Sequence, residues 1–330
     1  MRLSIEELRA FALGTVRVEE RGDGIVFHRF TEAEREFFRF RADIYAETFA
    51  DAGIVLDFVT DARRFSFDAR LSPASLRSWG FFDLAVDGSL AFHSGSDDVK
   101  AAPEVRFSAP LDGGRHRLTL HLPQLACAAL RSVELEGATF AEAQPRRRRI
   151  LLYGDSITQG YDAKYPSLTY GARLAAEFDA ELRNKGIGCD TFRAEVLAAS
   201  EAERRPDFII VAFGTNDWGL SSAELFRRRA SEFFTTLAEL HPGVPVAALT
   251  PIWRADWDHR ARAGTFADAA RIVAEAAKRD PDAVVIPGLK LVPPTVDFFG
   301  DRRAHPNDLG FAFYAENLAR ELRAAGLPRG

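Results

Sequence analysis

The sequence is poor in the residues that mark several special classes of protein. It has only 2 Cys and 1 Met in 330 residues, and Cys127 and Cys189 stand too far apart to suggest a disulfide framework or a CxxC metal site. No apolar run approaches the roughly 18 residues of a membrane span, and stretches such as 208–214 have the length of a strand. These absences exclude a disulfide scaffold and predict that the protein has no membrane partner.

The sequence also lacks a net positive charge, because 48 Asp and Glu outnumber 43 Lys and Arg; the net charge is −5 and the sequence pI is about 5.9. We therefore expect no nucleic-acid partner. The one basic run, Arg146 to Arg149, could contact nucleic acid or a nucleotide, but its place between two unlike segments favours a solvated linker. The N-terminus carries Glu6, Glu7 and Arg9 where a secretory signal would be apolar, so we expect a cytoplasmic location. The composition leaves the oligomeric state open and is compatible with a homo-oligomer.

The remaining composition is that of a folded protein, with 47% hydrophobic and 28% charged residues. The length predicts about two domains, and the pattern changes after Pro145. We therefore expect a β-sandwich domain at 1–145 and an α/β domain at 146–330. In the first, short alternating segments separated by turn residues predict an antiparallel, jelly-roll-like sandwich, preceded by a helix that Ser4 and Glu7 cap.

The second half alternates near-continuous apolar runs with amphipathic stretches, which predicts a doubly wound α/β fold with a five-stranded parallel sheet. The expected strands are 150–154, 181–187, 207–214, 244–250 and 283–288; the expected helices are 168–179, 191–203, 221–240, 264–279 and 309–325. In such folds ligands bind at the carboxyl ends of the strands. The loops that follow these five runs should therefore carry the chemistry.

Four such loops hold candidate residues. Ser156 follows the first strand on a turn flanked by glycines, where it could be a nucleophile or could cap the next helix. Asn216 follows the third strand, where it could stabilise an oxyanion or form an Asx turn. Gly188 and Cys189 follow the second strand and offer backbone N–H groups, while His305 precedes the last helix and is the best placed general base.

Taken together, GDSITQG, NKGIGCDT, GTNDWG and HPNDLGF occur in the order of the four sequence blocks of the SGNH (GDSL-type) hydrolases, and residues 148–325 resemble that family. The amino-terminal half, notably GFFDLAV at 80–86, is similar to the β-sandwich that precedes the hydrolase domain in some bacterial members, including carbohydrate acetyl esterases. The resemblance implies a flavodoxin-like hydrolase fold. It also implies a serine esterase that needs no cofactor and no metal.

The resemblance further implies roles for individual residues. Ser156 would be the nucleophile and His305 the base, and the oxyanion would be held by Ser156, by Gly188 or Cys189, and by Asn216. Two positions depart from the family pattern. Cys189 stands where the family has glycine, and its thiol is a rival nucleophile. The family's acid lies three residues before the histidine, where this chain has Arg302, so Asp301 at four residues before is expected to orient His305; the alternative is a Ser–His dyad.

The substrate is predicted from the residues around these loops. Tyr161, Trp218, Trp253 and Trp257 follow strand ends, where they could stack on a sugar, wall a small acyl pocket or pack over the core. Asp155 is expected to face the substrate. No long apolar lid separates the blocks, which favours a short acyl group such as acetyl on a small-molecule or oligosaccharide ester. The alternatives are an acyltransferase on sugars, a lipase, lysophospholipase or thioesterase, a non-catalytic carbohydrate-binding protein, and a flavodoxin-like nucleotide binder.

Overall fold

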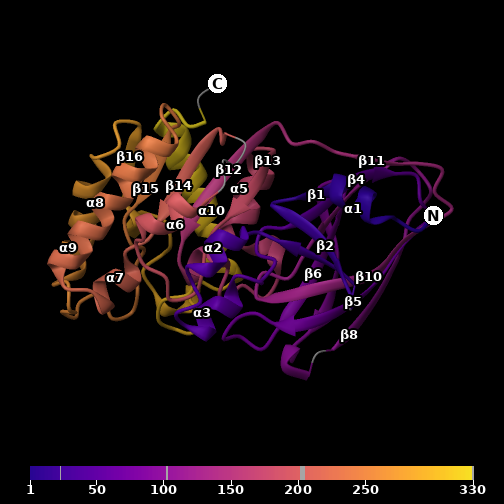
Figure 1. Cartoon of the computed structure of the whole chain (residues 1–330), viewed down its shortest axis with the longest axis horizontal. Coiled ribbons are helices and arrows are strands. Elements are labelled where there is room, and N and C mark those ends of the chain that lie inside the picture. Colours follow the sequence, from indigo (N-terminus) through magenta and orange to yellow (C-terminus); the bar gives the residue numbers. More distant parts are fainter. Residues whose placement is uncertain (23, 102, 201–204, 329–330) are drawn as a thin grey trace.

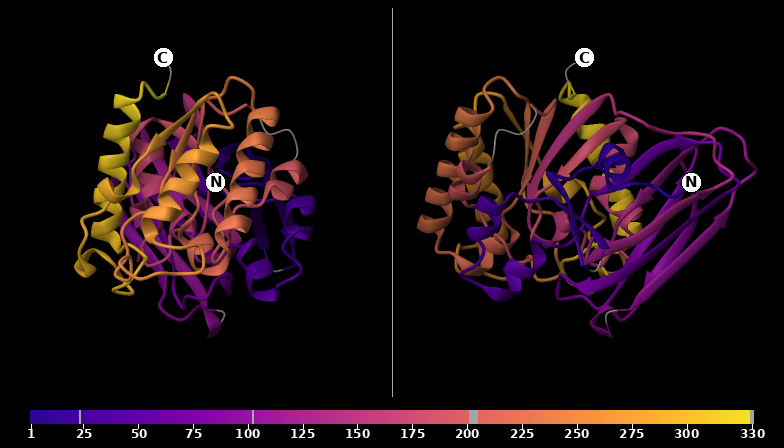
Figure 2. Two further views of the ribbon diagram at one scale, coloured as in Figure 1. Left: turned by 90° about the vertical axis from the view of Figure 1, so that its left-hand side faces the viewer. Right: turned by 45° about the vertical axis from the view of Figure 1, so that its right-hand side comes forward.

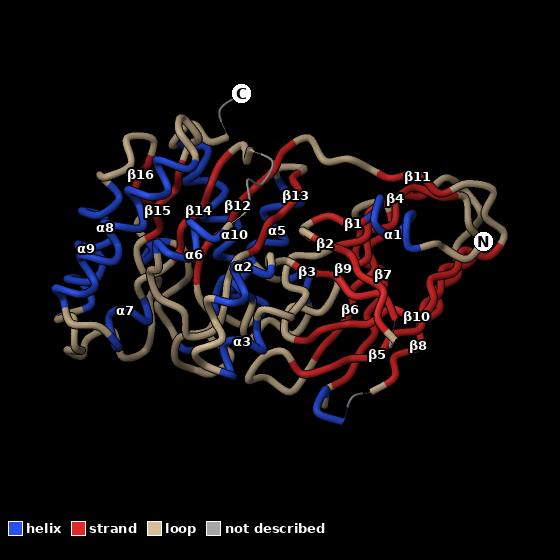
Figure 3. The backbone as a smooth tube through the Cα atoms, in the orientation of Figure 1, coloured by secondary structure: helices blue, strands red, loops and turns tan. Residues whose placement is uncertain are grey.

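The computed structural model describes residues 1–22, 24–101, 103–200 and 205–328. Its amino-terminal region holds two antiparallel sheets, and its carboxy-terminal region holds one parallel sheet between helices (Figure 1). Figure 3 separates the two regions by the colour of their elements, since strands dominate one and alternate with helices in the other. The predicted fold classes of both regions are confirmed.

The two antiparallel sheets pack face to face as a sandwich. One sheet has the order β1-β4-β9-β6-β7, with β11 beside β4; the other has the order β2-β3-β10-β5-β8. Alternation along the strands turns every second side chain inward, so Phe67 of β5 meets Phe82 of β6 with ring centroids 4.7 Å apart. The strands are β1 (Ala12–Leu13), β2 (Arg17–Arg21), β3 (Gly24–His28), β4 (Val55–Thr60), β5 (Arg64–Pro73), β6 (Gly80–Val86), β7 (Ser89–Ser96), β8 (Glu104–Pro110), β9 (His116–His121), β10 (Ala126–Glu136) and β11 (Ala141–Ala143).

Short helices accompany the sandwich. Helix α1 (Ile5–Phe11) begins at the predicted capping box of Ser4 and Glu7, and η1 (Val99–Ala101) precedes β8. Helices α2 (Glu32–Glu36) and α3 (Ala42–Glu47) were not predicted, although Thr31 and Glu34 form a second capping box. These two helices lie against the α/β region beside α6 (Figure 1). There Phe38 and Ile44 pack with Ile187 and Val196.

The parallel sheet has the order β13-β12-β14-β15-β16, as expected for a doubly wound fold. Its strands are β12 (Arg148–Gly154), β13 (Ala180–Asn184), β14 (Phe208–Ala212), β15 (Val246–Leu249) and β16 (Ala283–Ile286). Both faces are covered, because Leu152 and Ile210 belong to one buried cluster while Leu151 and Val211 belong to another. The strands therefore read as continuous apolar runs.

Helices cover each face of this sheet. Helices α5 (Tyr170–Glu177) and α10 (Asp308–Ala324) pack on one face, and α6 (Ala194–Ala199), α8 (Ala223–Leu240) and α9 (Phe266–Ala277) pack on the other. The left view of Figure 2 shows yellow α10 across the sheet from orange α8 and α9. Shorter elements are α4 (Ser156–Gln159), α7 (Thr215–Leu220), η2 (Pro166–Leu168), η3 (Gly288–Lys290) and η4 (Val296–Phe298). The predicted helix at 191–203 ends at Ala199, and its positions 201–203 lie outside the described residues.

The arginine run joins the two regions and is not a solvated linker. Arg146 is mostly buried and pairs with Asp57 of β4 at 2.6 Å and with Asp179 at 3.4 Å. Arg149 pairs with Glu181 at 3.3 Å, and only Arg147 is largely exposed. The prediction of a free linker was wrong because acidic side chains from both regions meet the run.

The structure also bears on membrane-spanning helices and on the two cysteines. Among the described residues, none of the helices combines the length and the apolar character that crossing a membrane requires. Both cysteines, Cys127 and Cys189, are free thiols.

Candidate active site

The turn after β12 presents Ser156 at the carboxyl edge of the parallel sheet. Asp155, which precedes it, is the N-cap of α4 and accepts a hydrogen bond from the Ile157 N–H at 3.0 Å. The helix is therefore capped by Asp155, and the alternative role of Ser156 as the cap was wrong. The hydroxyl of Ser156 is left for another partner.

Asp155 itself does not face a substrate. Its side chain is almost fully buried, and burial raises its pKa to about 6. The expectation that Asp155 binds substrate was wrong, because its side chain is buried and its Oδ1 accepts the N-cap hydrogen bond.

A second loop, between η4 and α10, brings a histidine to the serine. The Ser156 Oγ lies 2.8 Å from Nε2 of His305, and Nδ1 of His305 lies 2.7 Å from Oδ2 of Asp301. These three side chains form one hydrogen-bonded chain in which the imidazole is the centre.

The unusual spacing of four residues between Asp301 and His305 has a local cause. Arg302 adopts a left-handed φ of 53°, which adds a bulge to the loop. The other carboxylate oxygen of Asp301 then accepts hydrogen bonds from the backbone N–H groups of Arg303, Ala304 and His305, at 2.8, 2.8 and 3.1 Å. The loop thus folds around the carboxylate and directs it at the ring.

These contacts set the charge of Asp301. Partial burial alone would raise its pKa, but the hydrogen bonds from His305 and the backbone N–H groups outweigh burial and lower the pKa below the usual range of an aspartate. Asp301 is therefore an anion beside the imidazole at neutral pH.

The loop after β13 brings Cys189 to the same edge. Gly188 cannot offer an N–H to a ligand, because that group already donates to Glu47 Oε2 at 2.5 Å and to Gln159 Oε1 at 2.9 Å. The prediction that Gly188 supplies an oxyanion donor was wrong. Cys189 has the left-handed φ of 60° that favours glycine, and no acceptor in the described part of the chain takes its N–H.

The thiol of Cys189 is not activated. Burial and the nearby carboxylate of Glu47 raise its pKa, whereas a cysteine nucleophile needs a lowered pKa. The rival interpretation of Cys189 as the nucleophile is therefore not supported by its surroundings.

Asn216 stands at the start of α7 and reaches toward the same loop. The N-cap of α7 is Gly214, and the Asn216 side-chain amide donates to the carbonyl oxygen of Asp190 at 2.9 Å. Asn216 is thus held beside Cys189 through the adjoining residue. Its amide carries a second N–H, and its side chain is not an Asx cap.

The four aromatic residues differ in what they offer a ligand. Trp218 is buried, donates to the Gly264 carbonyl at 3.0 Å and packs against Phe266. Trp253 is half-buried against Phe299. Trp257 is 47% exposed. The prediction that Trp218 stacks on substrate was wrong, because its ring belongs to the core.

Tyr161 is also buried, so it cannot be an open stacking platform as predicted. Its ring instead lies beside the imidazole of His305, with centroids 5.5 Å apart. Its hydroxyl donates to Glu47 Oε1 at 2.7 Å. Tyr161 therefore forms a wall behind the histidine.

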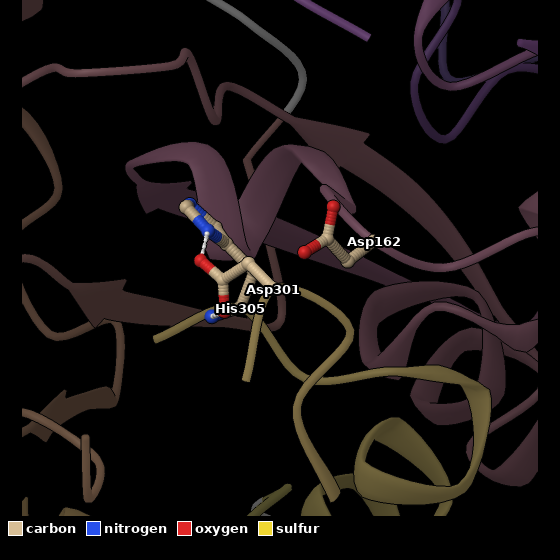
Figure 4. Close-up of side chains that lie close together, drawn as sticks. All are labelled: Asp162, Asp301 and His305. Carbon is tan, nitrogen blue, oxygen red and sulfur yellow. Dashed lines mark hydrogen bonds and ion pairs between the residues drawn. The ribbon is translucent and has the colours of Figure 1, made fainter. Parts of the chain in front are cut away.

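Asp162, Asp301 and His305 gather closely enough that their types could hold a metal ion (Figure 4). Most of the atoms that could ligate a metal already take part in hydrogen bonds, however. Both oxygens of Asp301 accept hydrogen bonds, and Oδ1 of Asp162 accepts one from Arg77 at 2.6 Å. The cluster fits a serine–histidine–aspartate arrangement with a neighbouring carboxylate.

Several residues at the site carried no sequence signal. Glu47 and Arg77 come from the amino-terminal region, far from the four loops in sequence, and Asp162 lies two residues beyond the glycine that ends α4. The Thr31 capping box could have predicted α2, but nothing in the pattern indicates that the following segment reaches the catalytic loops.

Comparison with known proteins shows which family and which solved structures this chain resembles. Residues 152–313 match the model of the GDSL-like Lipase/Acylhydrolase family. No curated protein sequence matched significantly. Among solved structures, the salicylyl-acyltransferase SsfX3 from a tetracycline biosynthetic pathway is similar, with 23% identity, a TM-score of 0.83, and coverage of 96% of this chain and 94% of the other.

Two esterases are similar over the same length. A family two carbohydrate esterase from Clostridium thermocellum, solved in complex with cellohexaose, has 15% identity and a TM-score of 0.66, covering 95% of this chain and 98% of the other. The acetyl xylan esterase Est2A from the rumen bacterium Butyrivibrio proteoclasticus has 13% identity and a TM-score of 0.66, covering 100% of this chain and 99% of the other. The similarity to all three extends through the sandwich.

Proposed function

We propose, from the match of residues 152–313 to the GDSL-like lipase/acylhydrolase family, that the protein is a serine esterase that transfers an acyl group through Ser156. The observation that carries the proposal is the hydrogen-bonded chain from Ser156 through His305 to Asp301, with distances of 2.8 and 2.7 Å. A base within hydrogen-bond reach of a nucleophile, and itself oriented by a carboxylate, is what acyl transfer requires.

The first step is attack on the ester. His305 Nε2 takes the hydroxyl proton of Ser156 as Oγ bonds to the carbonyl carbon, and Asp301 stabilises the imidazolium. The resulting oxyanion accepts hydrogen bonds from the N–H groups of Ser156 and Cys189 and from the Asn216 amide. His305 then returns its proton to the leaving alkoxide, so an alcohol departs and an acyl-Ser156 ester remains.

The second step releases the acyl group. A water molecule gives its proton to His305 while its oxygen bonds to the acyl carbon, and the Ser156 Oγ leaves with the proton returned by the histidine. The products are a carboxylic acid and free enzyme. No metal or cofactor enters either step.

For the substrate we propose a short acyl ester, with acetyl as the first choice, on a carbohydrate. Support comes from the sequence between the four blocks, which has no long apolar segment to shelter a long acyl chain, from the exposed ring of Trp257, and from the two carbohydrate esterases of similar fold. Initial rates on p-nitrophenyl acetate and p-nitrophenyl octanoate test the acyl length. Faster turnover of the octanoate ester would favour the lipase or thioesterase alternatives.

An acyltransferase is the second candidate, because the acyltransferase SsfX3 aligns with this chain at a TM-score of 0.83. The same acyl-Ser156 ester would then be resolved by an alcohol. Product analysis in the presence of acceptor sugars decides between them: free acetate indicates a hydrolase, and an acetylated acceptor indicates a transferase.

The direct test is activity on p-nitrophenyl acetate and on acetylated oligosaccharides with the wild type and Ser156→Ala side by side. We expect the substitution to lower kcat by at least about 10³-fold with an unchanged melting temperature. Activity that survives it would remove Ser156 from the mechanism. Binding of the oligosaccharides without turnover by either protein would support the carbohydrate-binding alternative. The cytoplasmic location stays a prediction.

A further inference from the structure

One buried carboxylate from the amino-terminal region lies between two loops of the proposed active site. Glu47 is the last residue of α3 and is 2% exposed. Its Oε1 accepts the hydroxyl hydrogen of Tyr161 at 2.7 Å, and its Oε2 accepts the N–H of Gly188 at 2.5 Å. A single side chain thus holds the wall behind the histidine and the loop that carries Cys189.

On the loop side, the contact fixes the backbone just before Cys189. The Gly188 N–H is shared by Glu47 and Gln159, and a Cβ at position 188 would collide with the Glu47 carboxylate. A side chain at position 188 would therefore displace the Glu47 carboxylate from this contact. Because Cys189 follows directly, the direction of its N–H depends on how Gly188 is held.

On the histidine side, the contact fixes Tyr161. Its hydroxyl donates to Glu47 and accepts the N–H of Leu76 at 3.2 Å, and the Arg77 guanidinium lies 4.9 Å from its ring centroid. The Tyr161 ring in turn packs beside His305 at 5.5 Å. Movement of Tyr161 would loosen the support of the imidazole.

Arg29 contacts both the loop that carries Cys189 and the backbone of Glu47. Its fully buried guanidinium donates to the carbonyl oxygens of Asn184 and Gly186, at 3.0 and 2.6 Å, and to that of Glu47 at 2.9 Å. The positive charge also compensates the carboxylate of Glu47, whose pKa burial raises. The loop that carries Cys189 is therefore held in two ways. Arg29 binds the carbonyl oxygens of Asn184 and Gly186, and Glu47 binds the N–H of Gly188.

We propose that Glu47 is a positioning residue for acyl transfer, acting through Gly188 on the oxyanion donor Cys189 and through Tyr161 on the base His305. This inference rests on the proposed serine esterase function. It makes the amino-terminal region a part of the active site and not only a neighbour of it.

Glu47→Leu and Glu47→Gln test the proposal in the full chain. Leucine fills similar space but accepts no hydrogen bond, so we expect kcat on p-nitrophenyl acetate to fall by about 10–100-fold with KM changed by less than about threefold. Glutamine can accept from Gly188 with its oxygen and donate to the Tyr161 hydroxyl with its amide. It should restore kcat to within about fivefold of the wild type.

Glu181→Leu is the matched control. Glu181 is also a buried carboxylate that accepts a backbone N–H across the same junction, that of Gly14 at 3.3 Å. It lies at the amino end of β13, however, whereas the proposed active site lies at the carboxyl ends of the strands. We expect it to lower the melting temperature and leave kcat unchanged. An equal loss of kcat in Glu181→Leu and Glu47→Leu would overturn the proposal, as would wild-type kcat in Glu47→Leu.

The rate of inactivation by diisopropyl fluorophosphate separates the two hypotheses. This reagent phosphorylates an activated serine, so a wild-type protein that neither reacts nor hydrolyses esters contradicts the proposed function itself. A reactive wild type with an equally reactive Glu47→Leu contradicts only the role of Glu47. If Glu47→Leu does not fold, Tyr161→Phe decides, because it removes only the hydroxyl: a kcat lowered by about 3–10-fold supports the connection, and a wild-type kcat overturns it.

Discussion

At the residue scale, two positions of the site depart from the family pattern, and in each a left-handed backbone conformation compensates for the departure. Asp301 stands one position earlier than the family's acid, yet it reaches His305 because Arg302 takes a left-handed conformation. Cys189 stands in place of a glycine and adopts the φ that a glycine would have. The residue types were readable from sequence, whereas the φ values that make them workable were not.

Asp301→Asn tests the orienting acid. The amide keeps the shape of the side chain but presents N–H or a neutral oxygen to the ring, so we expect kcat to fall by about 10²–10⁴-fold. Asp297→Asn is the control, because Asp297 lies in the same loop region but is exposed, and its side chain pairs with Arg302 at 3.5 Å. Steady-state kinetics on p-nitrophenyl acetate measure both. A full-activity Asp301→Asn would favour the Ser–His dyad.

Asn216→Ala tests the oxyanion donor from α7. Removing one preorganised donor costs about 10²–10³-fold in kcat in comparable sites, and we expect that loss here with little change in KM. Because the Asn216 amide also holds the Asp190 carbonyl, the melting temperature should be measured alongside. A loss below about threefold would remove Asn216 from the mechanism.

At the element scale, the ends of β12, β13 and β14 bring three carboxyl groups under the site. Asp155, Asp190 and Asp217 are all buried, and burial, together with their mutual repulsion, raises the pKa of Asp217 to about 7. One oxygen of Asp217 has no hydrogen-bond partner among the described residues. Between about pH 4 and pH 7, the folded state therefore holds a proton on Asp217 that the unfolded chain, with a pKa near 4, gives up.

This difference predicts a pH dependence of stability. Where the folded state binds more protons than the unfolded state, stability falls as pH rises, so Asp217 destabilises the fold progressively from about pH 4 to pH 7 and by a constant amount above. At pH 8, Asp217→Asn should have a higher free energy of unfolding than the wild type. This advantage over the wild type should be larger at pH 8 than at pH 5 by on the order of 2 kcal/mol. Chemical unfolding at the two pH values measures this. An equal difference at both would contradict the raised pKa.

The elements that the sequence predicted are those whose burial leaves a pattern along the chain, either a continuous apolar run or a regular alternation. The strands of the parallel sheet are buried on both faces and the sandwich strands on one, and each leaves its own pattern. Helices α2 and α3 are too short to show a periodic face, and their packing partners lie in another region. Tyr161 and Trp218 were misjudged for a related reason, since a loop aromatic can be buried by segments distant in sequence.

At the scale of the whole molecule, the two regions are tied by buried charges. We propose that residues 1–145 and 146–330 are two domains, as the change of pattern predicts, and that they unfold together because of this junction. Arg29 alone donates to the carbonyl oxygens of Ala50, Asn184, Gly186 and Glu47. The contacts of Glu47 with Tyr161 and Gly188 likewise join residues that are 114 and 141 positions apart in the sequence. No local sequence pattern predicts contacts over such separations.

Arg29→Met tests the junction. Methionine fills the space but leaves these buried carbonyl groups without donors, so we expect a loss of on the order of 3 kcal/mol and a single unfolding transition at a lower temperature. Differential scanning calorimetry measures both. A second, separate transition in the wild type would contradict cooperative unfolding, and an unchanged melting temperature in Arg29→Met would contradict the role of the guanidinium.

In the proposed mechanism, Ser156 carries the acyl group between the two steps. The most direct test of this role is mass spectrometry of the protein quenched in acid during turnover of p-nitrophenyl acetate, followed by peptide mapping. We predict one added acetyl group on the peptide that contains Ser156, and none on that peptide in Ser156→Ala. Turnover with no acetyl group on that peptide, or with the acetyl group on Cys189, would contradict it.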